Sequence, residues 1–265
     1  MGSELIKDRR IFKESNVLVQ SESVEAIEAA MTSISVNRSE LEKYLLSHPK
    51  FLHSLRPISI EVRVPRVVRL MTESTCPLNI GPMAAVAGAL ADLAVESMRE
   101  VNAEVAIVEN GGEVSAYSER GFTIGLYAGR TQLAGTMGFQ IEPSECPIGV
   151  GTSSATVSHA LSFGEADAAT VFADTATLAD AGATAVCNMV KGKEVEASVQ
   201  RGLRYAETID FLRGVLIVRG DCIGVVGKVP KLIRIDDGSG NKGSLEVAIA
   251  KRMCFLQRSS ATSTR

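Results

Sequence analysis

The 265-residue chain contains no tryptophan, and aromatic residues make up only 5% of it. Proteins that bind single-stranded nucleic acid stack bases on aromatic side chains, so this scarcity argues against that class. The net charge is only −3, which gives no electrostatic reason for binding nucleic acid or an anionic membrane. We therefore expect neither nucleic acid nor a membrane as a partner.

Paired cysteines and long apolar runs are also missing. The apolar runs are shorter than the roughly 20 residues that a membrane-spanning helix needs, and the first fifteen residues carry charges where a secretion signal needs an apolar core. An odd number of cysteines, without metal-site or redox-motif spacing, argues against a disulfide framework. These cysteines are Cys76, Cys146, Cys187, Cys222 and Cys254. We expect a soluble, cytoplasmic protein.

Hydrophobic periodicity predicts several elements in the first half of the chain. A hairpin is expected over Arg9 to Ser21, followed by a helix that begins at Ser21-Glu22-Ser23 and ends at Pro49. Alternating residues over Ile58 to Val64 predict a half-buried strand. A helix rich in small residues is expected from Gly81 to Arg99, with Pro82 in its first turn.

The second half shows hairpins and a second helix of small residues. Strands are expected at Glu104 to Glu109, Glu113 to Ser118 and Phe122 to Ala128, and a strand followed by an alanine-rich helix spans Ala169 to Cys187. A further hairpin covers Val215 to Gly227. The pattern predicts an α+β fold with a mainly antiparallel sheet and long helices packed on one face.

A domain boundary is expected near the C-terminus. Residues 1–235 are predicted to form a single domain, and residues 236–265 a linker and a poorly ordered tail that includes a short basic helix. The two small-residue helices each follow an extended segment, which hints at an internal duplication. Close packing of such helices also leads us to expect a homo-oligomer.

Asp180 and Thr184 lie one turn apart on the alanine-rich helix, so they share a face. Carboxylate and hydroxyl oxygens suit a hard cation such as Mg²⁺. The alternative is a helix cap, because Thr177-x-x-Asp180 fits a variant capping box at the start of this helix. The spacing alone leaves both interpretations open.

Three other segments carry candidate site residues. Asn110, Gly111, Gly112 and Glu113 form either a bare backbone surface for a phosphate or ring, or an ordinary two-residue hairpin turn. Thr152, Ser153 and Ser154 follow Gly151 at a predicted loop-to-helix junction, as either an anion cradle or a helix cap. His159 is either an acid or base in catalysis or a structural hydrogen-bonding residue.

The order of these motifs resembles the ApbE-like superfamily, whose best-known members transfer FMN from FAD to a threonine or serine of a target protein. The resemblance is closest to a prokaryotic branch found largely in anaerobic archaea and bacteria, and it covers about Arg9 to Ile235. The motifs of that branch are present as GPMAAVAGA, VENGG, TSSAT, LSFGEADA and LADAGAT, with Gly88 inside the first.

The resemblance implies a T-fold-like architecture, FAD or FMN as ligand, Mg²⁺ as a cofactor and a protein acceptor as a partner. By position in the motifs, Asp180 and Thr184 correspond to metal ligands. The glycine turn at Gly111 and the hydroxyls that begin at Thr152 correspond to the lining of the flavin site, and His159 to a catalytic position.

Several motif positions depart from the transferases. Ala87 stands where they have a lysine, Glu113 replaces their turn aspartate, and the segment after His159 lacks their aspartate and proline. Losing a charged contact to a pyrophosphate costs on the order of 1.5–3 kcal/mol. Gly182 replaces a better helix former, which implies that something approaches its backbone.

Three functions follow as alternatives. The first is a Mg²⁺-dependent enzyme that transfers or hydrolyses a flavin nucleotide at its pyrophosphate. The second is a binding protein that has kept the pocket and lost the chemistry. The third is a T-fold protein for a pterin-like or purine-like small molecule, since a fold by itself does not fix its ligand.

Overall fold

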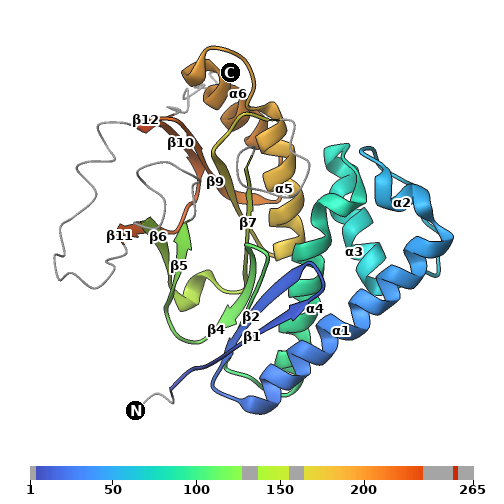
Figure 1. Cartoon of the computed structure of the whole chain (residues 1–265). Helices are drawn as coiled ribbons and strands as arrows, with labels where there is room; N and C mark the ends of the chain where they lie inside the picture. Colours follow the sequence, from blue (N-terminus) through green and yellow to red (C-terminus); the bar gives the residue numbers. More distant parts are fainter. Residues whose placement is uncertain (1–3, 127–136, 155–163, 235–252, 256–265) are drawn as a thin grey trace, which may run out of the picture.

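The computed structural model describes residues 4–126, 137–154, 164–234 and 253–255. A layer of helices covers one face of a large, mainly antiparallel sheet, and a small second sheet lies across the opposite face (Figure 1). This confirms the α+β architecture expected from the sequence. The second sheet is an addition that the periodicity did not indicate.

The large sheet contains nine strands in the order β1-β2-β3-β4-β7-β8-β9-β10-β12. All neighbours are antiparallel except β10 and β12, which are parallel. The strands are β1 (Ile6–Phe12), β2 (Ser15–Ser21), β3 (Val105–Asn110), β4 (Glu113–Ser118), β7 (Ile148–Ser153), β8 (Ala168–Ala173), β9 (Leu212–Arg219), β10 (Cys222–Gly227) and β12 (Met253–Phe255).

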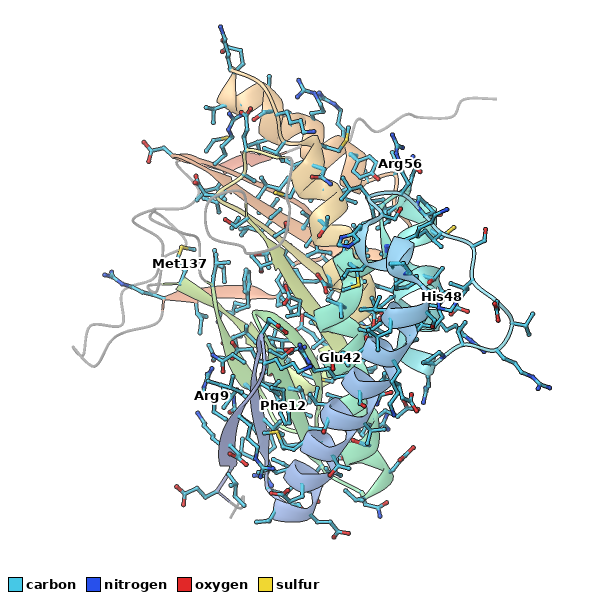
Figure 2. The ribbon with its side chains drawn as sticks, turned by 45° about the vertical axis from the view of Figure 1, so that its right-hand side comes forward. Arg9, Phe12, Glu42, His48, Arg56 and Met137 are labelled. Atoms are coloured by element: carbon cyan, nitrogen blue, oxygen red, sulfur yellow. The ribbon has the colours of Figure 1, made fainter. Side chains whose placement is uncertain are left out.

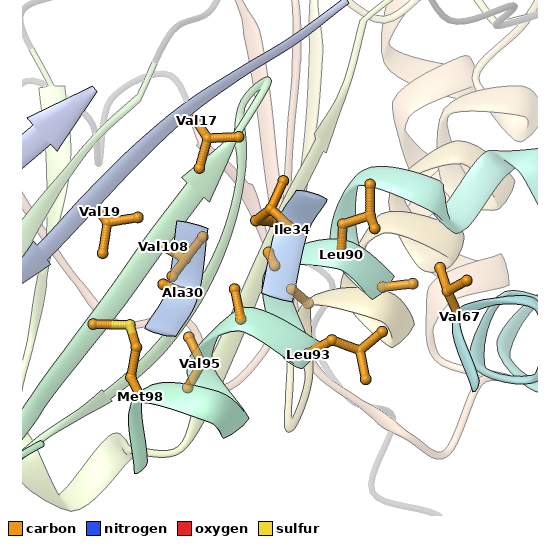
Figure 3. Close-up of a cluster of buried hydrophobic side chains, with 14 of the residues drawn as sticks. Val17, Val19, Ala30, Ile34, Val67, Leu90, Leu93, Val95, Met98 and Val108 are labelled. Atoms are coloured by element: carbon orange, nitrogen blue, oxygen red, sulfur yellow. The ribbon is translucent and has the colours of Figure 1, made fainter. Parts of the chain in front are cut away.

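The helical layer packs on the large sheet through two apolar clusters. One of them joins strands β2 and β3 to the long first helix and to α4, and Figure 3 shows Ile34 and Leu90 within it. The helices are α1 (Val24–Ser47), α2 (Pro49–His53), α3 (Arg66–Thr75), α4 (Val86–Glu100), α5 (Ala176–Met189) and α6 (Val195–Ala206), with 3-10 turns η1 (Cys76–Leu78), η2 (Pro82–Ala85) and η3 (Pro143–Glu145).

The second sheet has three antiparallel strands in the order β11-β6-β5. They are β5 (Phe122–Leu126), β6 (Met137–Ile141) and β11 (Lys231–Arg234). Its apolar side chains meet one face of the large sheet, so β3 is buried on both sides. Ala106 and Val108 face the helices, whereas Val105 and Ile107 face the second sheet.

Both small-residue helices pack inside the protomer. Ala91 on α4 and Ala179 and Ala181 on α5 are fully buried, and α5 packs closely on β7 and on α4. These faces therefore leave little surface for a second copy of the chain. Self-association stays a prediction, but it no longer has support from the small-residue helices, because their small-residue faces are already used inside the protomer.

The structure confirms the hairpins β1–β2, β3–β4 and β9–β10 and the helix start at Ser23, whose hydroxyl accepts the Ala26 N–H. The strand predicted for Ile58 to Val64 is wrong. Its alternate residues Ile58, Ile60 and Val64 do pack on the helical core, but no described strand lies beside the segment to complete a ladder.

Two further boundaries differ from the prediction. The helix expected from Gly81 begins as the 3-10 turn η2, and α4 starts only at Val86, where an acid from α5 accepts its first N–H groups. Met253–Phe255 form a strand on the open edge of β10, where the sequence favoured a helix.

Among the described residues, no single helix is long and apolar enough to span a membrane. One sharply bent pair, Arg66–Leu78 with Pro82–Glu100, meets the length and composition test only when its two parts are combined.

Candidate functional site

Helices α4 and α5 each supply an acid to the start of the other. Asp180 on α5 accepts the N–H of Gly88, in the first turn of α4, at 3.0 Å. Asp92, one turn further along α4, accepts the N–H groups of Ala176 and Thr177 at 2.9 and 2.8 Å. These donors have no partner within their own helix, so each carboxylate caps the neighbouring helix.

The predicted capping box, which paired Thr177 with Asp180 at the start of α5, is therefore wrong. The N-cap of α5 is Thr175, whose hydroxyl accepts the Leu178 N–H at 3.3 Å. Thr177 lies inside the helix and donates its hydroxyl to Asp92 instead. Asp180 is a cap, but it caps α4, which periodicity within one helix could not show.

Close backbone contact holds Asp180 in place. A Cβ atom on Gly151 of β7 would lie 2.6 Å from the backbone nitrogen of Asp180, and one on Gly88 would lie 2.3 Å from the Ala176 carbonyl oxygen. Only glycine fits at such contacts. The expectation that something approaches Gly182 is also confirmed, here by side chains, because a Cβ atom on Gly182 would lie 2.8 Å from a methyl group of Leu212 and 3.2 Å from one of Val171.

The β3–β4 hairpin reaches the same point from the sheet. Gly111 and Gly112 form its two-residue turn with φ of 69° and 118°, a conformation that favours glycine. Both glycines are exposed, whereas Asn110 is buried and donates its side-chain amide to the Ala87 carbonyl oxygen at 3.1 Å. The hairpin is thus tied to the first turn of α4, beside Asp180.

Glu113 opens β4 on the helix-facing side of the hairpin and is partly buried. Burial, followed by the negative charge of Asp180, raises the pKa of Glu113 well above its usual range. Burial also raises the pKa of Asp180 to about 7, with a further contribution from Asp92, although N–H groups of Gly88 and Ala87 act in the opposite direction. Ionisation of both Glu113 and Asp180 therefore costs free energy, because the positive charge around these two carboxylates is too small to compensate them.

Thr184 follows Asp180 by one turn and is partly buried. No hydrogen bond joins its side chain to another described residue. Two carboxylates and a hydroxyl form a donor set of hard oxygens, which fits Mg²⁺. The described residues contain no group of three or more His, Cys, Asp or Glu side chains able to hold a metal, so a cation here also needs oxygens from a ligand or from water.

The hydroxyls at Thr152, Ser153 and Ser154 do not act as one cradle. The predicted loop-to-helix junction is wrong up to Ser153, because β7 continues to that residue. Strand alternation turns Ser153 to the helix side with Gly151 and turns Thr152 to the opposite face, where its hydroxyl lies 3.0 Å from that of Thr170. Ser154 is buried just beyond the strand. His159 lies outside the described residues.

Asp92 was absent from the predicted site, although its carboxylate accepts more hydrogen bonds than that of Asp180. Besides α5, it accepts the hydroxyl of Ser115 on β4 at 2.6 Å. The sequence carried one signal for Asp92, because each of the two small-residue helices has an acid on it, Asp92 on one and Asp180 on the other. Asp92 also borders a groove of about 730 Å³ between α3, α4, β4 and the start of α5, and no described residue of the predicted site lines it.

Known proteins share both sequence and architecture with this chain. The family model "AbpE bacteria" matches residues 9–210. A UPF0280 protein of Methanocaldococcus jannaschii is 41% identical over 232 residues, which cover 87% of this chain and 94% of that protein. A UPF0280 protein of Methanopyrus kandleri is 38% identical over 244 residues, covering 91% and 98%.

Solved structures share the fold at low sequence identity. The apo flavinyl transferase ApbE of Pseudomonas stutzeri superposes with a TM-score of 0.55 at 17% identity, covering 84% of this chain and 94% of that one. The flavin transferase ApbE of Vibrio cholerae gives a TM-score of 0.54 at 14% identity, covering 90% and 98%. With the family match, these findings show that the chain belongs to the AbpE-bacteria family and is a member of the ApbE-like superfamily.

Proposed function

We propose that the chain binds a flavin nucleotide, such as FAD or FMN, together with Mg²⁺ at the junction of the β3–β4 hairpin with α4 and α5. The observation that carries the proposal is the pair of carboxylates of Glu113 and Asp180, whose pKa values are both raised. A divalent cation would compensate both charges, and Thr184 offers a third oxygen one turn away. The fold shared with flavin transferases supports a flavin as the nucleotide.

In this proposal each part of the junction has a distinct task. The carboxylate of Asp180 keeps the start of α4 in position by accepting N–H groups of its first turn, and it would also supply an oxygen to the cation. The exposed Gly111–Gly112 turn has no side chains, so a pyrophosphate or a flat ring can approach its backbone closely. A bound cation would neutralise phosphate charge, which would favour attack on the pyrophosphate by an acceptor hydroxyl or by water, with AMP as the leaving group.

A second function, binding without turnover, is favoured by Ala87. This residue lies in the first turn of α4 next to Asp180, where the transferases carry a lysine. Its methyl group offers no positive charge to a leaving phosphate, and its carbonyl oxygen is already engaged by Asn110. Binding would persist under these conditions, while stabilisation of a developing negative charge would be weaker.

The test combines thermal stability with product analysis. The purified chain is incubated with FAD and Mg²⁺, the melting temperature is measured, and released AMP is quantified with and without a protein extract as acceptor. A stabilisation that needs both ligands supports the proposed site, because a ligand bound only to the native state raises stability. Released AMP selects the enzyme, and stabilisation without AMP selects the binding protein.

Asp180→Asn should abolish the Mg²⁺-dependent part of the shift. Asp174→Asn is the matched control, because Asp174 is an exposed acid just before α5 that pairs with Arg213. If neither FAD nor FMN raises the melting temperature of the wild-type chain in the presence of Mg²⁺, the proposed function is refuted. The same holds if Asp180→Asn leaves the Mg²⁺ effect intact.

A further inference from the structure

Residues 43–63, from the end of α1 through α2 and the segment beyond it, form a corner at the outer edge of the helical layer. Figure 1 places this corner on the side of the molecule away from the three-stranded sheet, and Figure 2 shows Arg56 and His48 on it. It is a compact unit, because Tyr44 stacks on His48 with ring centroids 4.0 Å apart and meets Phe51 edge-on at 5.3 Å.

The corner exposes aliphatic side chains to an unusual degree. Leu46 is 86% exposed and Val62 is 90% exposed, and Leu55 and Leu52 are 53% and 43% exposed. Its aromatic residues face inward, with Phe51 buried and Tyr44 partly buried. Four of the nine exposed large hydrophobic side chains of the described residues therefore fall within seventeen residues of one another.

The same corner is positively charged. It contains one acid, Glu61, and four exposed cations, which are Lys43, Lys50, Arg56 and Arg63. Within the part of the chain that the structure describes, none of these four cations forms an ion pair, whereas Arg38 and Arg213 elsewhere do. The whole-chain charge of −3 hides this local excess, so the charge balance of the sequence does not report on it.

These features favour an anionic, apolar partner over a second copy of the chain. A two-fold symmetric contact would place the corner against itself and bring its cations together. Exposed aliphatic side chains together with an excess of lysine and arginine fit a surface that rests in the headgroup layer of an anionic membrane.

We propose that the corner at residues 43–63 is a peripheral membrane-binding surface. Its cations would contact anionic headgroups, while Leu46 and Val62 would enter the region between headgroups and acyl chains. The three-stranded sheet would face away from the membrane. This inference rests on exposure and charge at the corner and is independent of the flavin site.

The experiment is co-sedimentation of the full chain with sucrose-loaded vesicles. Vesicles of phosphatidylcholine and phosphatidylglycerol in equal amounts should carry the protein down, vesicles of phosphatidylcholine alone should not, and added salt should weaken binding. Lys43→Ala and Lys50→Ala should each lower the partition coefficient about fivefold. Leu46→Ser combined with Val62→Ser should lower it by roughly tenfold or more.

Matched controls distinguish binding through the corner from non-specific adsorption of the protein to vesicles. Val24 is 62% exposed at the opposite end of α1, about 33 Å from Leu46, so Val24→Ser should leave binding unchanged. Lys231→Ala, an exposed lysine on the three-stranded sheet, should also have no effect. All substituted side chains are exposed, and circular dichroism verifies that each variant is folded.

Three outcomes overturn the proposal. The first is a wild-type chain that stays in solution with anionic vesicles. The second is an equal loss of binding in the Val24→Ser control and in the variant that combines Leu46→Ser with Val62→Ser. The third is binding that poly-glutamate abolishes and that Leu46→Ser with Val62→Ser does not change, because the partner is then an acidic polymer or protein.

Discussion

Replacing Asp92 with alanine should destabilise the protein more than any other single acid-to-alanine change among the described residues. Asp92 accepts four hydrogen bonds from the Ala176 and Thr177 N–H groups and from the hydroxyls of Thr177 and Ser115. All four donors belong to the junction of α4, α5 and β4. Alanine leaves them without an acceptor at a site where Thr177 and Ser115 are buried.

The magnitude follows from the number and type of these bonds. Bonds to a charged acceptor contribute about 1.5–3 kcal/mol each, but losses at one site are not additive. Loss of a helix cap alone costs about 1 kcal/mol. We therefore expect Asp92→Ala to lower the free energy of unfolding by about 3–5 kcal/mol, which corresponds to a fall in melting temperature of roughly 10 °C for a chain of this size.

The assay is urea unfolding followed by circular dichroism, with thermal unfolding as a second measurement. Asp92→Asn should lie between wild type and Asp92→Ala, because the amide keeps one acceptor oxygen. Asp174→Ala is the matched control: its ion pair with Arg213 involves an acid that is 70% exposed, so its loss should cost less than about 1 kcal/mol.

A loss below about 1 kcal/mol for Asp92→Ala would refute the capping role of this carboxylate. So would equal losses for Asp92→Ala and Asp174→Ala, since the exposed pair contributes little. A change in unfolding cooperativity would invalidate the comparison, so the urea dependence must match that of the wild type.

Other expected outcomes concern Asp180 and its neighbours. The pKa of Asp180 is about 7 in the folded chain against an ordinary 3.8, so its ionisation opposes folding. The free energy of unfolding should therefore fall as the pH rises from about 4 to about 7, by roughly 2–4 kcal/mol, and Asp180→Asn should flatten this dependence in urea titrations. Mg²⁺ should raise the melting temperature more at pH 8 than at pH 5, because protons compete for the carboxylates; an equal effect at both values would contradict the site. Thr184→Val should reduce the Mg²⁺-dependent shift while leaving the metal-free melting temperature within about 2 °C of wild type. Gly151→Ala should cost about 3 kcal/mol or more in urea unfolding, because its methyl group would overlap the backbone of α5.

The sequence by itself determined the elements whose information is local. Asn110–Gly111–Gly112 predicted a tight hairpin because glycine tolerates positive φ, and the structure has that turn. Gly182 predicted a close approach to its helix, and Leu212 makes it. The order of the motifs resembled that of the ApbE-like superfamily, and the family match confirms this membership.

Only the tertiary structure decided which groups meet. Periodicity could show that Asp180 lies on a helix, but not that it caps α4 while Asp92 caps α5, because both contacts join residues more than 80 positions apart. Strand alternation separated Thr152 from Ser153 once β7 was found to reach that far. The Ile58–Val64 segment has the pattern of a strand and is not one, because a strand needs a neighbour, and the pattern within a segment carries no information about what folds beside it.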